Sequence, residues 1–173
     1  MENTQPTTGK FALKYGLLLG GISVAFGLML YFMDMHYQQS MSIFVVSIVI
    51  MLAVILLALY QFKKENGGYM TFGEALKIGV GLCLIGGIIS MLFQLLLSNV
   101  IDPGMVDKQL ELARAKMVDY GMTPEQIDSQ MEMSKKFSGP LIQAAFGFIA
   151  SIFFGFILTL IPALVMKKSE NEM

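Results

Sequence analysis

Charged residues are scarce in this sequence. Only 14% of its 173 residues are Asp, Glu, Lys or Arg, whereas a water-soluble domain has about 25%. The formal net charge is −1, so the chain has no basic excess and gives no support to nucleic-acid binding, which leaves a basic footprint. The mean hydropathy is +0.64 and 55% of the residues are hydrophobic. This composition leaves little room for a separate soluble domain.

Cysteine and histidine are nearly absent. The single cysteine, Cys83, cannot form an internal disulfide, and the single histidine is His36. The sequence has no Ser-x-x-Lys, no His-Glu-x-x-His, no glycine-rich phosphate loop and no paired aspartates in an apolar run. We therefore predict no catalytic, cofactor-binding or metal-binding residue, and we expect that the protein is not an enzyme.

Long apolar runs are abundant instead. Four runs contain no Asp, Glu, Lys, Arg or His: Tyr15–Met33, Ile43–Phe62, Ile78–Ile101 and Leu141–Met166. Each has at least the roughly 18 residues that a helix needs to cross about 30 Å of hydrocarbon. The first run exceeds the usual length of a signal-peptide core, about 7–15 residues, so we expect a retained span. We predict an all-α integral membrane four-helix bundle, one domain over 1–173 with spans at about 15–33, 43–62, 76–101 and 141–166.

The distribution of lysines predicts the orientation. The first connection, Asp34–Ser42, has no Lys or Arg, while the long third connection, Asp102–Pro140, has five basic and seven acidic residues. Basic residues favour the cytoplasmic side, and long loops weigh less in this comparison. We expect both termini to be cytoplasmic and the third connection to be extracytoplasmic. The lysines on the cytoplasmic side are then Lys10, Lys14, Lys63, Lys64, Lys77, Lys167 and Lys168.

The third connection, 102–140, has the pattern of a helical hairpin. Asp102-Pro103 predicts an N-cap followed by proline at N1, and Gly121 predicts the end of that helix. Thr123-Pro124-Glu125-Gln126 predicts a second capped start, and Ser138-Gly139-Pro140 a break before the last span. The two amphipathic helices are expected to rest on each other or on the outer membrane surface. The alternative is that a partner protein docks on their Met and Leu face.

A capping box also predicts where the third helix begins. Thr71 and Glu74 have the required spacing, and Asn66-Gly67-Gly68 before them is a turn signal. We expect this helix to begin near Phe72.

Small residues recur at every third or fourth position in three of the four spans. Such rows let helix backbones approach closely in lipid. We expect helices one, three and four to form the tight core and helix two to face more lipid, although the same rows could serve a homo-oligomer. The rows are Gly16, Gly20, Ser23 and Gly27; Ala75, Gly79, Cys83 and Gly87; and Gly147, Ser151, Gly155, Thr159 and Ala163.

Few polar side chains lie within the spans. We expect them to act as hydrogen bonds between helices, and a solute path is the alternative. The set comprises Gln94, Ser98, Asn99, Gln143, Thr159 and scattered serines.

A copper site is the one metal hypothesis that the residue types allow. Thioether and imidazole ligands suit Cu(I), and Met33-Asp34-Met35-His36, Met41 and Met131-Glu132-Met133 carry such groups. The 15 methionines of the chain make a flexible apolar filler the favoured interpretation.

The pattern resembles a known family. Asn66-Gly67-Gly68-Tyr69-Met70-Thr71-Phe72-Gly73-Glu74-Ala75, Asp102-Pro103, Gly121-Met122-Thr123-Pro124 and Lys167-Lys168 are similar to the bacterial membrane family named domain of unknown function 4199. The resemblance implies a small inner-membrane protein with four helices and implies no activity.

The sequence thus predicts a non-enzymatic structural or interaction protein of the bacterial inner membrane. Its expected partners are the lipid bilayer, a protein at the outer hairpin or a second copy through the small-residue rows. A small-solute transporter or channel subunit is the alternative.

Overall fold

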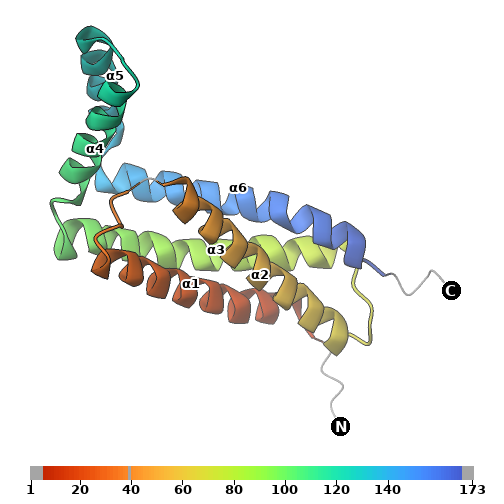
Figure 1. Cartoon of the computed structure of the whole chain (residues 1–173). Coiled ribbons are helices and arrows are strands. Elements are labelled where there is room, and N and C mark those ends of the chain that lie inside the picture. Colours follow the sequence, from red (N-terminus) through yellow and green to blue (C-terminus); the bar gives the residue numbers. More distant parts are fainter. Residues whose placement is uncertain (1–5, 39, 169–173) are drawn as a thin grey trace.

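Four long helices form a bundle in the computed structural model, which describes residues 6–38 and 40–168. They are α1 (Thr8–Phe32), α2 (Met41–Glu65), α3 (Phe72–Leu96) and α6 (Pro140–Met166), and they lie side by side (Figure 1). Each is long and apolar enough to cross a membrane. The prediction of an all-helical chain with four apolar spans is confirmed for the described residues.

The helices extend beyond the predicted apolar runs. α1 begins at Thr8 rather than near Tyr15, and α2 continues to Glu65, because Lys and Glu are good helix formers once the chain leaves the hydrocarbon. α3 begins at Phe72 as predicted. Its capping box is present: the Glu74 carboxylate accepts a hydrogen bond of 2.7 Å from the Thr71 N–H, and the Glu74 N–H donates to the Thr71 hydroxyl.

The end of the third span differs from the prediction. After α3 the chain makes a π-helical turn, Leu97–Ile101, and α4 (Met105–Asp119) begins with Gly104 at its N-cap. The prediction that Asp102 caps this helix is therefore wrong. The Asp102 carboxylate instead accepts hydrogen bonds from two side chains, His36 and Lys108. Bonds between charged partners are stronger than a bond to a neutral backbone N–H, which explains the preference.

The second helix of this region, α5 (Pro124–Phe137), starts as predicted. The Thr123 hydroxyl accepts from the Gln126 N–H, and the Gln126 side chain accepts from the Thr123 N–H. Gly121 ends the preceding helix with φ of +74°, a conformation that glycine adopts without steric cost.

Helices α4 and α5, together called the arm, contact each other. Ile127 and Met131 are buried, and Arg114 Nη2 lies 3.4 Å from Asp128 Oδ1. The arm leaves the bundle at the end opposite the start of α1 and the end of α6, and it extends across the direction of the bundle helices (Figure 1).

Helix α3 lies between α1 and α6, and small residues make both contacts. A side chain at Gly16 or Gly20 would overlap Ile85 or Ile89 of α3. On the other side of α3, the small-residue rows of α3 and α6 interlock within one chain, as the sequence predicted. The α3–α6 contacts join Gly79 to Thr159, Gly87 to Ser151 and Cys83 to Gly155.

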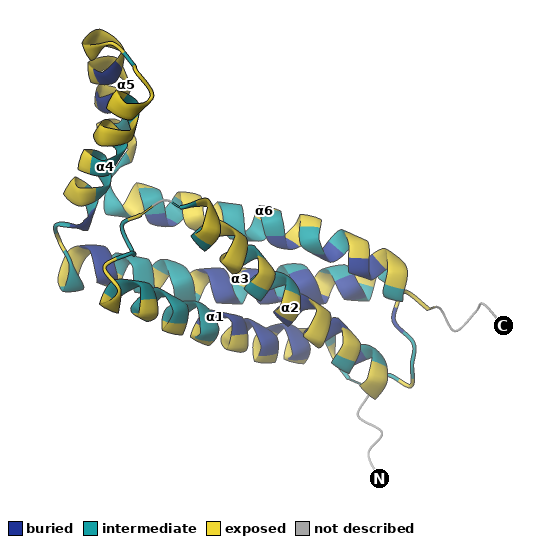
Figure 2. Cartoon of the chain, in the orientation of Figure 1, coloured by how far each residue is buried: buried dark blue, intermediate teal, exposed yellow. Residues whose placement is uncertain are grey.

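Helix α2 is only partly as predicted. Its first half faces outward, since Phe44 and Val49 are exposed. Its second half packs into the core, where Ile55, Leu59 and Phe62 are at most 1% exposed. Figure 2 shows this buried region in the half of the bundle where α1 begins. The expectation that α2 faces more lipid therefore holds for its first half. In its second half one face is buried in the core, while the other, with Leu56, Leu57 and Tyr60, is exposed.

The same end of the bundle is closed by backbone hydrogen bonds. Met70 and Lys168 exchange N–H···O bonds of 3.1 and 2.9 Å. Lys63 Nζ donates a 2.7 Å bond to the Met166 carbonyl, which has no partner within its own helix. These contacts tie the α2–α3 connection to the end of α6.

Candidate functional site

A charged cluster lies at the arm end of the bundle. His36 Nε2 lies 2.9 Å from Asp102 Oδ2, and Lys108 Nζ lies 3.1 Å from the same oxygen. The His36 side chain is only 3% exposed, and its ring contacts those of Tyr31 and Tyr37. The cluster thus links the α1–α2 connection to the start of the arm.

The cluster shifts two pKa values. The hydrogen bond from His36, aided by Lys108 and opposed by partial burial, holds the pKa of Asp102 below its ordinary value. The hydrogen bond to Asp102 raises the pKa of Lys108 above its ordinary value. Both shifts favour the charged forms, so the carboxylate and the ammonium stabilise this junction at neutral pH.

The residues of the copper hypothesis take up separate roles. His36 Nε2 is engaged by Asp102, Met131 is buried in the arm, and Met133 is exposed. Among the described residues, no group of three or more His, Cys, Asp or Glu side chains is arranged to hold a metal ion. The structure therefore adds no observation in favour of the copper site.

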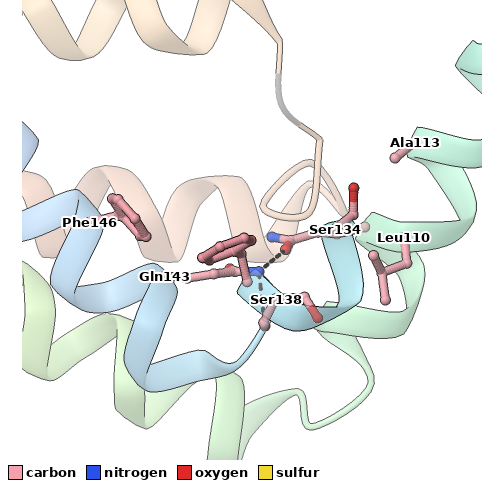
Figure 3. A pocket seen from close by; sticks show the side chains of 8 residues that line it. Leu110, Ala113, Ser134, Ser138, Gln143 and Phe146 are labelled. Carbon is pink, nitrogen blue, oxygen red and sulfur yellow. Dashed lines mark hydrogen bonds between the residues drawn. The ribbon is translucent and has the colours of Figure 1, made fainter. Parts of the chain in front are cut away.

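A groove of about 440 Å³, the arm groove, lies between the arm and the first turns of α6. Gln143 stands at its base, where its Nε2 donates to Gln109 Oε1 and to the Ser138 carbonyl, both at 3.1 Å. Figure 3 shows Phe146 of α6 and Leu110 of α4 on its walls.

A second cavity, the α3–α6 cavity, has a volume of about 250 Å³ and shares Gln143 with the arm groove. Gln94 of α3 and Ser151 of α6 line it as well. Two of the polar span residues singled out in the sequence therefore form a pair. Gln94 and Gln143 face one cavity, although no hydrogen bond joins them among the described side chains.

A third cavity, the bundle cavity, lies among all four long helices and has a volume of about 260 Å³. Each of these helices contributes one serine to its wall, and the remaining lining is mostly apolar. The bundle cavity shares Gly87, Ser90 and Ser151 with the α3–α6 cavity. The four serines are Ser23, Ser47, Ser90 and Ser151.

The polar side chains of the spans differ in their partners. Ser98, Asn99 and Thr159 donate to carbonyl groups of their own helices, at 2.8, 2.8 and 2.6 Å, so they are satisfied locally. The side chains of Ser90 and Gln94 have no hydrogen-bond partner among the described residues, although both line cavities. The same is true of Ser23 in the bundle cavity, so these three are among the polar groups that are available to a ligand.

Sequence reasoning found part of this site. It singled out Gln94, Gln143 and His36, and it missed the roles of Gln109 and Lys108. The partners His36 and Asp102 are 66 positions apart, and no local pattern signals a contact over that separation.

Comparison with known proteins gives one match. The model of a family described as "Protein of unknown function (DUF4199)" matches residues 14–168, which confirms the resemblance found in the sequence. No curated protein and no solved structure matches the chain.

Proposed function

The chain belongs to the DUF4199 family, whose description names no activity, and we propose that it is a non-enzymatic accessory protein of the bacterial inner membrane. In this proposal both termini are cytoplasmic and the arm is an extracytoplasmic helical hairpin. The protein acts through contacts of the arm with the lipid surface.

The charge distribution supports this orientation. The seven lysines lie at the start of α1, the end of α2, the start of α3 and just after α6, and these segments meet at one end of the bundle (Figure 1). The α1–α2 connection at the other end has no Lys or Arg. Such an asymmetry favours the lysine-rich end on the cytoplasmic side.

One observation carries the lipid contact: an apolar strip continues from α6 onto α5. Phe146 lies roughly 9 Å along α6 from Pro140, at 1.5 Å per residue, and its ring packs against that of Phe137 with centroids 6.5 Å apart. Phe137, Phe146 and Met133 are 55%, 59% and 63% exposed. In this proposal Phe146 lies in a span, so its exposed neighbours on α5 lie at the boundary of the hydrocarbon.

The side of α5 next to this strip is polar. Glu132 and Lys136 are exposed and lie 3.9 Å apart as an i,i+4 pair. A helix with apolar residues on one face and charged residues on the other lies in the membrane interface, with its apolar face buried by about 5–10 Å. The arm therefore has the composition of an interfacial helix pair.

A spin-label experiment tests the lipid contact. We expect a nitroxide at Met133→Cys to be relaxed more by oxygen than by a water-soluble nickel complex in proteoliposomes, and one at Glu132→Cys to show the opposite order. Both variants carry Cys83→Ala, since Cys83 is the only native cysteine. Equal accessibility of both labels to the nickel complex contradicts the proposal.

A partner protein on the same face is the alternative within this class. The small-residue rows offer less to a second copy, because Gly16, Gly79 and Gly155 are already covered by the chain's own helices. Photo-cross-linking from Met133 in native membranes distinguishes the cases: adducts with lipid support the proposal, and one dominant protein adduct supports the alternative.

Transport of a small solute is the second candidate function. The observation in its favour is the series of cavities from the arm groove to the bundle cavity. Flux through proteoliposomes that is abolished by Gln94→Leu, while the variant remains folded, would place transport ahead of the accessory role.

A further inference from the structure

We propose that the α3–α6 cavity and the bundle cavity together form a binding site for one neutral amphiphile from the membrane. The ligand has an apolar chain and an uncharged head group that both donates and accepts hydrogen bonds. This inference goes beyond the accessory role and does not depend on whether the arm contacts lipid.

The two cavities adjoin each other. Gly87, Ser90 and Ser151 line both of them, and their volumes are about 250 and 260 Å³. Small-molecule sites in proteins have volumes of about 300–1,000 Å³. Either cavity alone falls below this range, so in this proposal one ligand occupies both.

The lining determines the charge of the ligand. No described residue that lines either cavity is Asp, Glu, Lys, Arg or His. A charged group there would lose its hydration without gaining an ionic partner, which is unfavourable in an apolar surrounding. An uncharged ligand avoids this cost.

The head group is placed by the glutamines. Gln94 offers both a donor and an acceptor, and it has no hydrogen-bond partner among the described residues. Gln143 uses its Nε2 for Gln109 and Ser138, so its Oε1 remains to accept a bond from a hydroxyl. A head group with a hydroxyl and a carbonyl complements both side chains.

The apolar chain is placed by the bundle cavity. Leu19, Phe26, Ile50 and Met51 form much of its wall. Beyond it the bundle is closely packed, since Leu82, Ile78 and Leu59 are 0% exposed. The cavity thus ends inside the protein, which favours binding over passage.

In this proposal the ligand enters the α3–α6 cavity beside α6. Gly147 lines the α3–α6 cavity and is exposed, and a Cβ at this position would meet no atom within 4 Å. The Cβ of a leucine here therefore has room, and we choose this residue to narrow the opening. Gly21 of α1 is also exposed and open, and it lines neither cavity, so it provides a matched control.

Photolabelling tests the site. The probe is a monoacylglycerol with a diazirine in its chain, mixed into phosphatidylcholine vesicles that contain the full-length protein. We expect labelled peptides to map to residues 87–94 and 143–151. Labelling should fall by about tenfold, equivalent to about 1.4 kcal/mol, in Gly147→Leu and should be unchanged in Gly21→Leu.

Two further probes separate the head group from the chain. Gln94→Leu should lower labelling by the monoacylglycerol but not by an alkane diazirine of equal length, and a fatty-acid anion should label these peptides less than the monoacylglycerol does. Gln94→Leu also replaces the filling variant if Gly147→Leu does not fold. Label spread evenly over the four helices, or equal labelling of wild type and both cavity variants, overturns the proposal.

Discussion

Asp102 shows how one residue can serve a different purpose from the one that its local sequence predicts. Followed by proline, it has the pattern of a helix cap, yet its carboxylate binds His36 and Lys108. The nearly buried imidazole lies on the α1–α2 connection. The bond between them therefore fixes the start of the arm relative to the bundle.

Removal of the Asp102 charge should destabilise the contact between the α1–α2 connection and the start of the arm. We expect Asp102→Asn to lower the free energy of unfolding in detergent at pH 7 by about 1–3 kcal/mol, since a hydrogen bond to a charged group contributes about that much. Chemical denaturation followed by circular dichroism measures the change. Glu111→Gln removes an exposed carboxylate from α4, which follows Asp102, and should have almost no effect.

The dependence of stability on pH follows from the direction in which the pKa of Asp102 is shifted. The pKa of Asp102 in the folded protein lies below its ordinary 3.8, so the stabilisation is present above pH 3.8 and is lost as the pH falls through the folded-state pKa. The difference between wild type and Asp102→Asn should therefore shrink below about pH 4. A difference that stays constant down to pH 2 would contradict this explanation.

Among the helices, α3 is the one whose packing depends most on glycine. Its contact with α6 at Gly79 leaves no room for a Cβ, because the fully buried side chain of Thr159 occupies that space. Lipid provides no hydrophobic drive for helices to associate, so close van der Waals contact of this kind supplies much of the stability.

Two glycine variants test this dependence. Gly79→Ala should destabilise the protein by about 1–3 kcal/mol, the usual cost of overpacking, whereas Gly147→Ala should leave stability unchanged, because its Cβ meets nothing. Thermal unfolding in detergent measures both. Equal melting temperatures for the two variants would show that the α3–α6 contact tolerates more separation than the structure has.

The capping boxes of α3 and α5 differ from the α3–α6 contact because they involve no second helix. Thr71 with Glu74 and Thr123 with Gln126 were identified from spacing alone, and both are formed. They are predictable because all their atoms lie within one turn of helix, where spacing in sequence determines distance in space.

The whole molecule has two dissimilar halves along the bundle. In the half that contains the start of α1, residues such as Ile55 and Leu82 are 0% exposed, while the half near the arm contains the α3–α6 cavity and the bundle cavity. In the proposed orientation, the closed half is cytoplasmic and the cavities lie in the outer leaflet.

Cysteine labelling tests this orientation. In intact cells, Glu125→Cys should react with an impermeant maleimide and Glu65→Cys should react only after permeabilisation, because the arm and the α2–α3 connection lie at opposite ends of the bundle. Both variants carry Cys83→Ala. Reaction of Glu65→Cys in intact cells would reverse the proposed orientation.

The sequence alone determined the number of long helices, most of their ends and the rows of small residues at which they pack. These features depend on hydropathy, spacing and caps within a few turns, so each is local. The tertiary structure decided that Asp102 pairs with His36, that one face of the second half of α2 is buried, and that Gln94 and Gln143 face one cavity. These depend on how helices distant in sequence are rotated against one another, and in spans that are apolar on every side the hydrophobic pattern leaves that rotation unspecified.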